Sequence, residues 1–200
     1  KQAKAIIPSH LWSAIVKVPE KLKQPRLAIG NYRADTVGAR TQAVAEQKEN
    51  NYDVVVWTDA SVNWSEDGST AAGGYKIKMK EADGSWGVVT TKSFYLGKDH
   101  SSYSAEQATL REALADSGLR KTEGKIGAFT DSLSNVQRVA GRKIVNELEK
   151  GLFEQIVETG DGRGIDLVWV KGHNEIAENE AVDQLAAEGY KGEDLSSKYP

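Results

Sequence analysis

Two acidic residues follow apolar segments that the sequence predicts to be buried strands. Asp59 comes directly after the run 54–58, which is rich in valine and contains a tryptophan, and Asp131 follows the short apolar segment 125–130. A carboxylate directed toward a core loses its hydration, and this cost must be offset by a partner or a cation. Both positions are therefore candidates for ion binding.

Two further acids lie on predicted helices. Glu106 shares one helical stripe with the apolar residues four and seven positions later, and Asp183 lies beside the apolar stripe of the last predicted helix. Each acid also has an ordinary alternative role. Asp131 could cap a helix, Glu106 could be an exposed acid of a first turn, and Asp183 could be surface charge.

The four acids are more informative as a set. In a parallel or mixed sheet, the ends of adjacent strands and the starts of the following helices lie on one side, where these carboxylates could converge. Oxygen ligands select hard cations such as Mg²⁺ or Mn²⁺. The sequence therefore predicts a metal-binding group of four carboxylates.

The elements that would position these acids can be predicted from periodicity and turn signals. In chain order they are strands at 54–58, 75–80 and 86–96, a helix at 105–117 begun by a Ser104 and Gln107 capping box, a strand at 125–130, a helical region at 132–159 with a break near Gly141, a strand at 165–170 and a helix at 178–190. The order βββαβαβα predicts an α/β fold with a mixed five-stranded sheet flanked by helices.

The first fifty residues show no clear period, apart from a short polar helix expected at 39–48. They carry nine basic and four acidic residues, a formal charge of +5, which leaves −8 for the remainder of a chain with a total charge of −3. We interpret 1–51 as a basic, irregular N-terminal arm or connector, 52–191 as the folded domain and 192–200 as a C-terminal tail.

Composition excludes several classes of protein. The chain has no cysteine, so disulfides and thiolate metal sites are absent, and its three histidines form no clustered zinc motif. No apolar run is long enough for a membrane span, and residues 1–4 lack the apolar core of a signal peptide. We expect a soluble protein of the cytoplasm or nucleus with no membrane partner.

Four segments together resemble the type I ribonuclease H domain. They are Thr58-Asp59-Ala60-Ser61, Ser102-Tyr103-Ser104-Ala105-Glu106, Thr130-Asp131-Ser132 and the long stretch from Trp169 to Ala186. Their order and the elements that carry them agree with that family throughout. The resemblance implies a ribonuclease H-like fold.

The resemblance also implies a reaction and its residues. Asp59, Glu106, Asp131 and Asp183 would hold two Mg²⁺ ions, for which Mn²⁺ can substitute, and His173 would assist proton transfer or product departure. The expected activity is endonucleolytic hydrolysis of the RNA strand of an RNA·DNA hybrid.

Substrate contacts are implied in the same way. The residues expected to contact the 2′-hydroxyls and backbone of the hybrid are Ala60, Ser61, Ser102, Tyr103 and Ser132. Basic patches could assist binding, and the candidates are Lys76, Lys78 and Lys80 on one strand and Arg138, Arg142 and Lys143 after Asp131; a solvated strand or helix face explains each set better.

The chain departs from the family pattern at three positions. Glu175 and Glu178 stand where the family usually has glycine, and Val182 stands where it usually has alanine. The two extra charges could strengthen ion binding or repel substrate phosphates. The compact connection 135–163 looks most like the domain of non-LTR retrotransposon polyproteins, where it follows a reverse transcriptase, and residues 1–51 would then be the connector to that partner region.

Two alternatives stay open. The chain could be a non-catalytic ribonuclease H-like module that binds nucleic acid or protein within a larger complex, although all four acids are present. It could also be another metal-dependent nuclease of the same fold, such as a resolvase or transposase. Metal-dependent cleavage of different duplexes distinguishes these readings.

Overall fold

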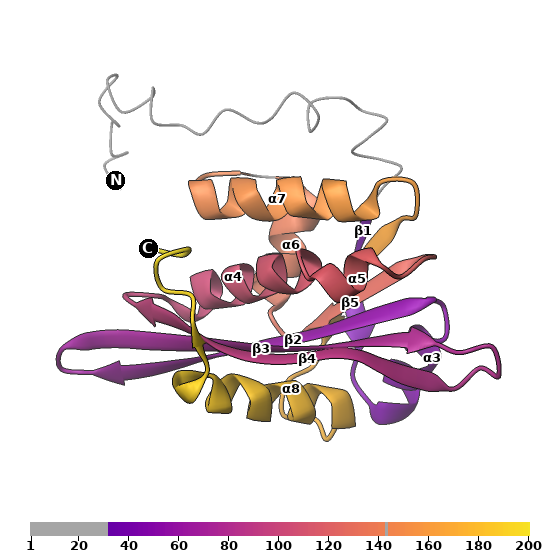
Figure 1. The fold of residues 1–200 in the computed structure, drawn as a ribbon, viewed down its shortest axis with the longest axis horizontal. Coiled ribbons are helices and arrows are strands. Elements are labelled where there is room, and N and C mark those ends of the chain that lie inside the picture. The colour runs from indigo at the N-terminus through magenta and orange to yellow at the C-terminus, as the bar shows by residue number, and fades with distance from the viewer. Residues whose placement is uncertain (1–31, 143) are drawn as a thin grey trace, which may run out of the picture.

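Seven strands form one sheet in the computed structural model, which describes residues 32–142 and 144–200 (Figure 1). The strands are β1 (Tyr32–Ala39), β2 (Val54–Ser65), β3 (Gly68–Lys80), β4 (Trp86–Lys98), β5 (Ile126–Thr130), β6 (Ile165–Val170) and β7 (Glu193–Asp194). The helices are α3 (Gln42–Glu49), α4 (Ser102–Leu114), α5 (Ser117–Arg120), α6 (Leu133–Gly141), α7 (Glu147–Gly160), α8 (Ala177–Glu188) and the 3-10 turn η2 (Gly189–Lys191).

The sheet is mixed, as predicted. Its strand order is β1-β6-β5-β2-β3-β4-β7. β2, β3 and β4 are antiparallel and joined by hairpins, whereas β5, β6 and β1 run parallel to β2 and to one another. All five predicted strands are present, and β1 and β7 extend the sheet at its two edges.

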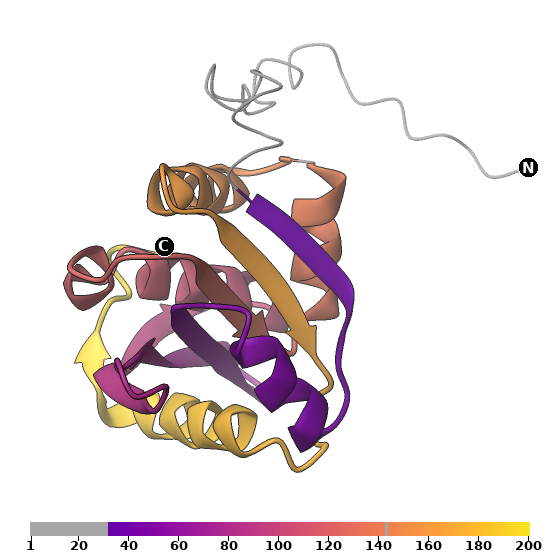
Figure 2. The same ribbon diagram turned by 90° about the vertical axis from the view of Figure 1, so that its right-hand side faces the viewer.

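Helices cover both faces of the sheet (Figures 1 and 2). α4, α6 and α7 lie on one face, and α8 and α3 lie on the other. The predicted break near Gly141 is confirmed, because α6 ends there and α7 begins at Glu147. Within the part of the chain that the structure describes, no helix has the length and apolar character needed to cross a membrane.

β2 is buried on both faces where it passes between these layers. Val54 and Val56 belong to the core under α4 and α7, while Val55 and Trp57 belong to the core under α8 and α3. Successive side chains of a strand point to opposite faces, so a continuous apolar run is what such a position requires. The run predicted from sequence is confirmed as the central strand.

The predicted irregular arm is wrong for residues 32–39, which form β1, whereas the short helix expected at 39–48 is confirmed as α3 (Gln42–Glu49). β1 pairs with β6 in parallel, with Tyr32 opposite Ile165 and Ala39 opposite Val170. A shift in register before Ala39 is accommodated by Gly38 at φ 62, where a Cβ would lie 1.8 Å from the carbonyl oxygen of Trp169. Residues 1–31 of the predicted arm lie outside the described residues.

The first long helix begins earlier than predicted. Ser101 is its N-cap and forms a capping box with Ser104, so the expected box of Ser104 and Gln107 is wrong. α4 ends at Leu114 and not at Ser117, because Asp116 caps the separate turn α5 by accepting from the backbone of Gly118 at 2.7 Å and Leu119 at 3.3 Å.

The predicted C-terminal tail packs against the domain. β7 pairs with β4, and the buried Tyr199 donates a hydrogen bond of 2.7 Å to Glu112 of α4. The buried His100 ring lies 3.1 Å from the carbonyl oxygen of Tyr199. Residues 192–200 are thus part of the folded unit in this structure.

Candidate active site

Asp59 and Asp131 lie beside each other where the pairing of β2 with β5 ends. β2 and β5 pair in parallel up to Thr58 opposite Thr130, and each aspartate is the next residue in its chain segment. Asp59 lies within β2, which continues to Ser65, whereas β5 stops before Asp131. The parallel register therefore places the two carboxylates side by side.

Glu106 reaches the same point from the first turns of α4. The backbone N–H of Ala60 donates to Asp59 Oδ1 at 2.8 Å and to Glu106 Oε1 at 2.9 Å, so one donor holds both carboxylates. Asp59 and Glu106 are both buried. Carboxylate oxygens of Asp59, Glu106 and Asp131 all lie within 4.8 Å of one another.

This crowding changes the protonation of the group. Burial, and then the charge of Asp131, raise the pKa of Asp59 to about 7. Burial, followed by the charges of Asp59 and Asp131, raises the pKa of Glu106 well above its usual value. Burial also raises the pKa of Asp131. Three carboxylates that resist ionisation together favour a bound cation as the compensating charge.

The donor set fits a hard divalent ion. Glu106 Oε2 is buried and has no hydrogen-bond partner among residues 32–142 and 144–200, and the potential ligands are all oxygen atoms. A buried carboxylate oxygen without a donor is costly, and metal coordination would satisfy it. Asp59, Glu106 and Asp131 could therefore hold a cation such as Mg²⁺.

Asp183 and His173 lie near this group but outside it. Asp183 is exposed on α8, and its charge raises the pKa of Asp59 and of Asp131. His173 is exposed in the loop before α8, at φ 56, and its charge lowers the pKa of Asp131. The structure thus brings three of the four predicted acids together and places Asp183 and His173 within electrostatic range.

The sequence of the chain that forms this carboxylate group matches a known protein family. The profile of the RNase H family matches residues 51–191, which is most of the chain. This chain belongs to the ribonuclease H family.

Solved structures agree with this ribonuclease H fold. The chain is similar to RNase H1 from the halophilic archaeon Halobacterium salinarum, with 21% identity, a TM-score of 0.52 and coverage of 69% of this chain and 97% of that one. It is similar to the RNase H domain of prototype foamy virus, with 22% identity, a TM-score of 0.52 and coverage of 69% and 94%. It is also similar to LC11-RNase H1, solved in complex with an RNA/DNA hybrid, with 21% identity, a TM-score of 0.53 and coverage of 69% of this chain and 96% of that one. No curated protein matches the chain.

The residues expected to contact substrate lie close in sequence to the three carboxylates, and their contacts in the structure differ. Ala60 supplies the shared N–H, and Ser61 Oγ lies 3.2 Å from the hydroxyl of Tyr190. Ser102 is exposed at the start of α4. Ser132 Oγ accepts a hydrogen bond of 2.8 Å from Asn135.

The hydroxyl of Tyr103 is already occupied. It donates to Glu149 at 2.8 Å and accepts from Arg138 Nε at 3.0 Å. Asn135 also donates to the carbonyl oxygen of Tyr103 at 3.3 Å. The ring of Tyr103 is therefore fixed at the edge of the site by contacts within the ribonuclease H domain.

Sequence reasoning missed residues that hold Asp131. The buried side chain of Asn179 lowers the pKa of the Asp131 carboxyl, and Trp169 Nε1 donates to the Asp131 carbonyl oxygen at 3.2 Å. Asn179 precedes Asp183 by four residues, so the two share one face of α8. That spacing was the available signal for Asn179.

The lysines considered as a basic patch on β3 are engaged within the domain. Lys76 and Lys78 form ion pairs with Glu178 at 3.0 and 2.9 Å, and Lys80 donates to the carbonyl oxygen of Asn50 at 2.9 Å. The extra charge of Glu178 is thus paired with two lysines. Its effect on ion or substrate binding stays a prediction, as does that of Glu175, which is exposed.

The second basic set also has internal contacts. Arg138 lies 3.4 Å from the buried Glu149, and the guanidinium of Arg142 lies over the ring of Tyr32 at 5.8 Å. Lys143 lies outside the described residues. Among the described residues, both arginines of this set therefore make contacts within the domain, and their role in binding nucleic acid stays a prediction.

Proposed function

We propose that this ribonuclease H domain hydrolyses the RNA strand of RNA·DNA hybrids, with two divalent metal ions held by Asp59, Glu106, Asp131 and Asp183. The observation that carries the proposal is the group of three carboxylates within 4.8 Å of one another, in a chain of the ribonuclease H family. LC11-RNase H1, to which the chain is similar, is in complex with an RNA/DNA hybrid in its structure.

Bound Mg²⁺ or Mn²⁺ ions would supply an activated water and charge stabilisation for the departing 3′-oxygen. The protein's own residues prepare this chemistry. The N–H of Ala60 orients Asp59 and Glu106, and Asn179 favours the ionised form of Asp131 by lowering its pKa. His173, beside Asp131, is suited to move a proton or to assist product departure.

Recognition of the RNA strand is assigned to the small polar groups that border the carboxylates. Ala60, Ser61, Ser102 and Ser132 would approach the 2′-hydroxyls, and the fixed ring of Tyr103 would line the groove of the hybrid. Ser102 is the most open of the serines, because it is exposed and its hydroxyl has no partner in the described residues.

We also propose that the domain works beside a reverse transcriptase in a retroelement. Prototype foamy virus protease-reverse transcriptase is among the similar structures, with a TM-score of 0.55 and 22% identity, and the match covers 70% of this chain and 21% of that one. A connector to such a partner would involve residues before Tyr32, because residues 32–49 form β1 and α3. Tethering would raise the effective concentration of the domain at the hybrid.

The test is cleavage of labelled RNA·DNA, RNA·RNA and DNA·DNA duplexes with Mg²⁺, with Mn²⁺ and with a chelator. Only the RNA of the hybrid should shorten, and Asp59→Asn and Asp131→Asn should abolish cleavage. Asp161→Asn is the matched control, since Asp161 is exposed at the other end of the strands. Hybrid binding without cleavage would indicate a non-catalytic module, and cleavage of DNA duplexes would indicate a resolvase or transposase type of nuclease.

A further inference from the structure

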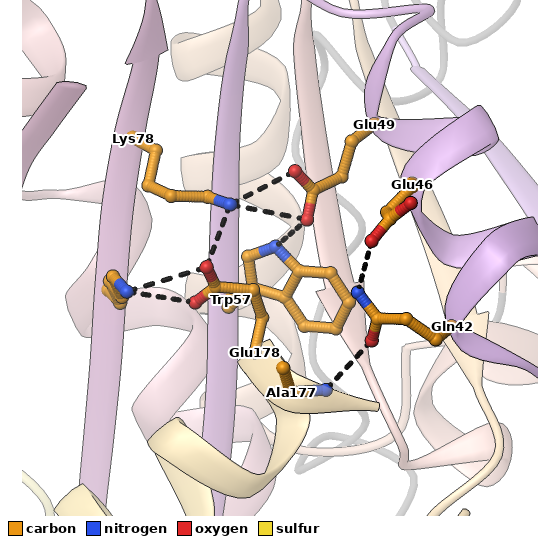
Figure 3. A network of polar contacts seen from close by, with 8 residues as sticks. Gln42, Glu46, Glu49, Trp57, Lys78, Ala177 and Glu178 are labelled. Carbon is orange, nitrogen blue, oxygen red and sulfur yellow. Dashed lines mark hydrogen bonds and ion pairs between the residues drawn. The ribbon is translucent and has the colours of Figure 1, made fainter. Parts of the chain in front are cut away.

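α8 begins without a capping side chain of its own. Its N-cap residue is Ile176, which makes no side-chain cap hydrogen bond. The N–H of Ala177 donates instead to Gln42 Oε1 of α3 at 2.9 Å (Figure 3). Because the first N–H groups of a helix lack partners within it, Gln42 acts as a cap supplied from another element.

Gln42 is held in the orientation that this cap requires. Its amide Nε2 donates to Glu46 Oε1 at 2.7 Å, one turn later on α3. That bond leaves the carbonyl oxygen of the side chain directed at α8, as Figure 3 shows. The loop before α8 is attached to the same segment, because Asn174 donates to the carbonyl oxygen of Arg40 and Lys171 N donates to that of Ala39 at 2.8 Å.

A buried ion-pair network joins the other end of α3 to the same turn of α8. Lys78 Nζ lies 3.0 Å from Glu49 Oε2 and 2.9 Å from Glu178 Oε1, and Trp57 Nε1 donates to Glu49 Oε1 at 3.1 Å (Figure 3). Glu49 and Lys78 are each 6% exposed. α3 thus contacts the first turn of α8 at two points, directly through Gln42 and through Lys78.

The first turn of α8 is also the part of the helix that reaches the carboxylate group. The loop before the helix, which carries His173, brings Gly172 so close to Asp131 that a Cβ there would lie 2.9 Å from Oδ2. The buried Asn179 side chain acts on the pKa of Asp131, and Asp183 follows one turn later. Any shift of this turn is therefore transmitted to all three side chains. α3 itself lies before residue 51, where the family match begins.

We propose that Gln42 and Glu49 of α3 are positioning residues that fix the first turn of α8, and thereby place Asn179, Asp183 and His173 against the carboxylate group. The inference rests on the proposed nuclease function. Neither α3 residue touches the carboxylates, so the effect acts through α8. The segment before the family match thus becomes part of the active site's support.

The test compares Gln42→Leu with Gln47→Leu in the full chain. Both changes replace an amide by an apolar group of similar size on α3, but Gln47 is exposed and has no partner in the described residues. Gln42→Leu should lower kcat for the hybrid by about tenfold, with little change in KM, because misplaced catalytic groups lose rate more than binding. Gln47→Leu should leave both unchanged.

Rescue separates positioning from general stability. Gln42→Glu combined with Glu46→Gln exchanges donor and acceptor and keeps an oxygen toward Ala177, so kcat should recover. Equal kcat in the two leucine variants would overturn the proposal. A loss of kcat that follows the melting temperature and is not rescued by the exchange would also overturn it.

Amide hydrogen exchange tests the positioning role of α3 independently of the proposed nuclease function. If the wild-type chain cleaves no hybrid, the proposed function fails, and amide hydrogen exchange then decides the positioning role alone. Gln42→Leu should accelerate exchange in residues 176–180 relative to Gln47→Leu. Unchanged exchange there would show that α3 does not hold the turn.

Discussion

Asp59 and Glu106 share one backbone donor, the N–H of Ala60, and both are buried. The pKa of Asp59 is raised from 3.8 to about 7, first by burial. A group whose pKa is higher in the folded state binds its proton more tightly there, so its contribution to stability is present at low pH and is lost as pH rises. The metal-free fold therefore loses stability as pH rises from about 4 to about 7, and the full cost of ionising Asp59 is present above about pH 7.

Asp59→Asn should stabilise the metal-free protein at pH 8. The amide keeps an oxygen for the Ala60 N–H and removes the charge, so we expect a gain on the order of 2 kcal/mol in the free energy of unfolding. The gain should shrink as pH falls from 7 toward 4, where the wild-type carboxyl is protonated. Urea unfolding with a chelator at pH 5 and pH 8 measures this.

Added Mn²⁺ supplies the control for that prediction. The ion should stabilise the wild-type protein at pH 8 and have a much smaller effect on Asp59→Asn, since binding to the native state alone raises stability. If the free energy of unfolding of the metal-free wild type and variant changed equally with pH, ionisation of Asp59 would not destabilise the fold, and the prediction would be wrong.

Gly172 lies against the carboxylate of Asp131. A Cβ at this position would be 2.9 Å from Asp131 Oδ2, so Gly172→Ala should displace the carboxylate while leaving the fold intact. We expect about tenfold weaker Mn²⁺ binding by calorimetry, comparable to the loss of a residue that orients a ligand. Gly141→Ala is the control, because a Cβ there meets nothing within 4 Å. Equal affinities in the two variants would contradict the prediction.

At the level of residues, the sequence predicted the acids that local patterns place in the core. Asp59 and Asp131 each follow a clear apolar run, and the parallel register of β2 and β5 then places the two carboxylates side by side. Asp183 could not be distinguished from surface charge, because it is exposed in the structure as well. Its relation to the site depends on the placement of α8, which is a tertiary property.

At the level of elements, β3 shows why local alternation has limits. Lys76, Lys78 and Lys80 alternate with apolar residues as in a half-exposed strand, and the strand itself is confirmed. Yet Lys78 is 6% exposed, because Glu49 of α3 and Glu178 of α8 enclose its ammonium group. Lys78 is therefore buried by two helices that are distant in sequence, and the alternation of residues within β3 cannot predict this burial.

Lys78→Met tests the network by removing its cation. Glu49 and Glu178 would stay close together without a partner, so we expect a loss of about 3–5 kcal/mol in the free energy of unfolding by urea denaturation. Lys80→Met, two residues later on the same strand, should cost less than about 1 kcal/mol, because Lys80 makes an exposed hydrogen bond to a carbonyl oxygen and a cation–π contact with Trp86, and neither contact is a buried ion pair. Similar losses in the two variants would mean that the buried network adds no stability.

β1 illustrates why a strand can be missed. Its sequence has few apolar residues, and the structure buries it only at Tyr32, Gly38 and Ala39. An edge strand has a ladder partner on one side alone, so its period-two signal is weak. The short helix expected at 39–48 was predictable from its own pattern and is found at Gln42–Glu49, but its packing was not.

At the level of the whole molecule, β1 and α3 complete both cores although they precede the family match at residue 51. Tyr32 packs edge-on against Phe153 of α7 at 6.3 Å between ring centroids, in the core under α4 and α7. Ala39 and Ala45 lie in the other core, which also contains Trp57. The stable unit is therefore larger than the segment that carries the family pattern.

A chain of residues 51–200 should consequently be less stable than one of residues 32–200, which keeps every described element. The shorter chain exposes the partners of Tyr32 and leaves Lys78 without Glu49, so we expect a loss on the order of 5 kcal/mol, a large fraction of what a domain of this size possesses. Thermal and urea unfolding followed by circular dichroism compare the two chains. The uncovered edge of β6 should also make the shorter chain aggregate, because an unpaired strand edge pairs with other molecules. If both chains unfold at the same urea concentration and stay monomeric, β1 and α3 are an appendage, and the folded unit coincides with the family match.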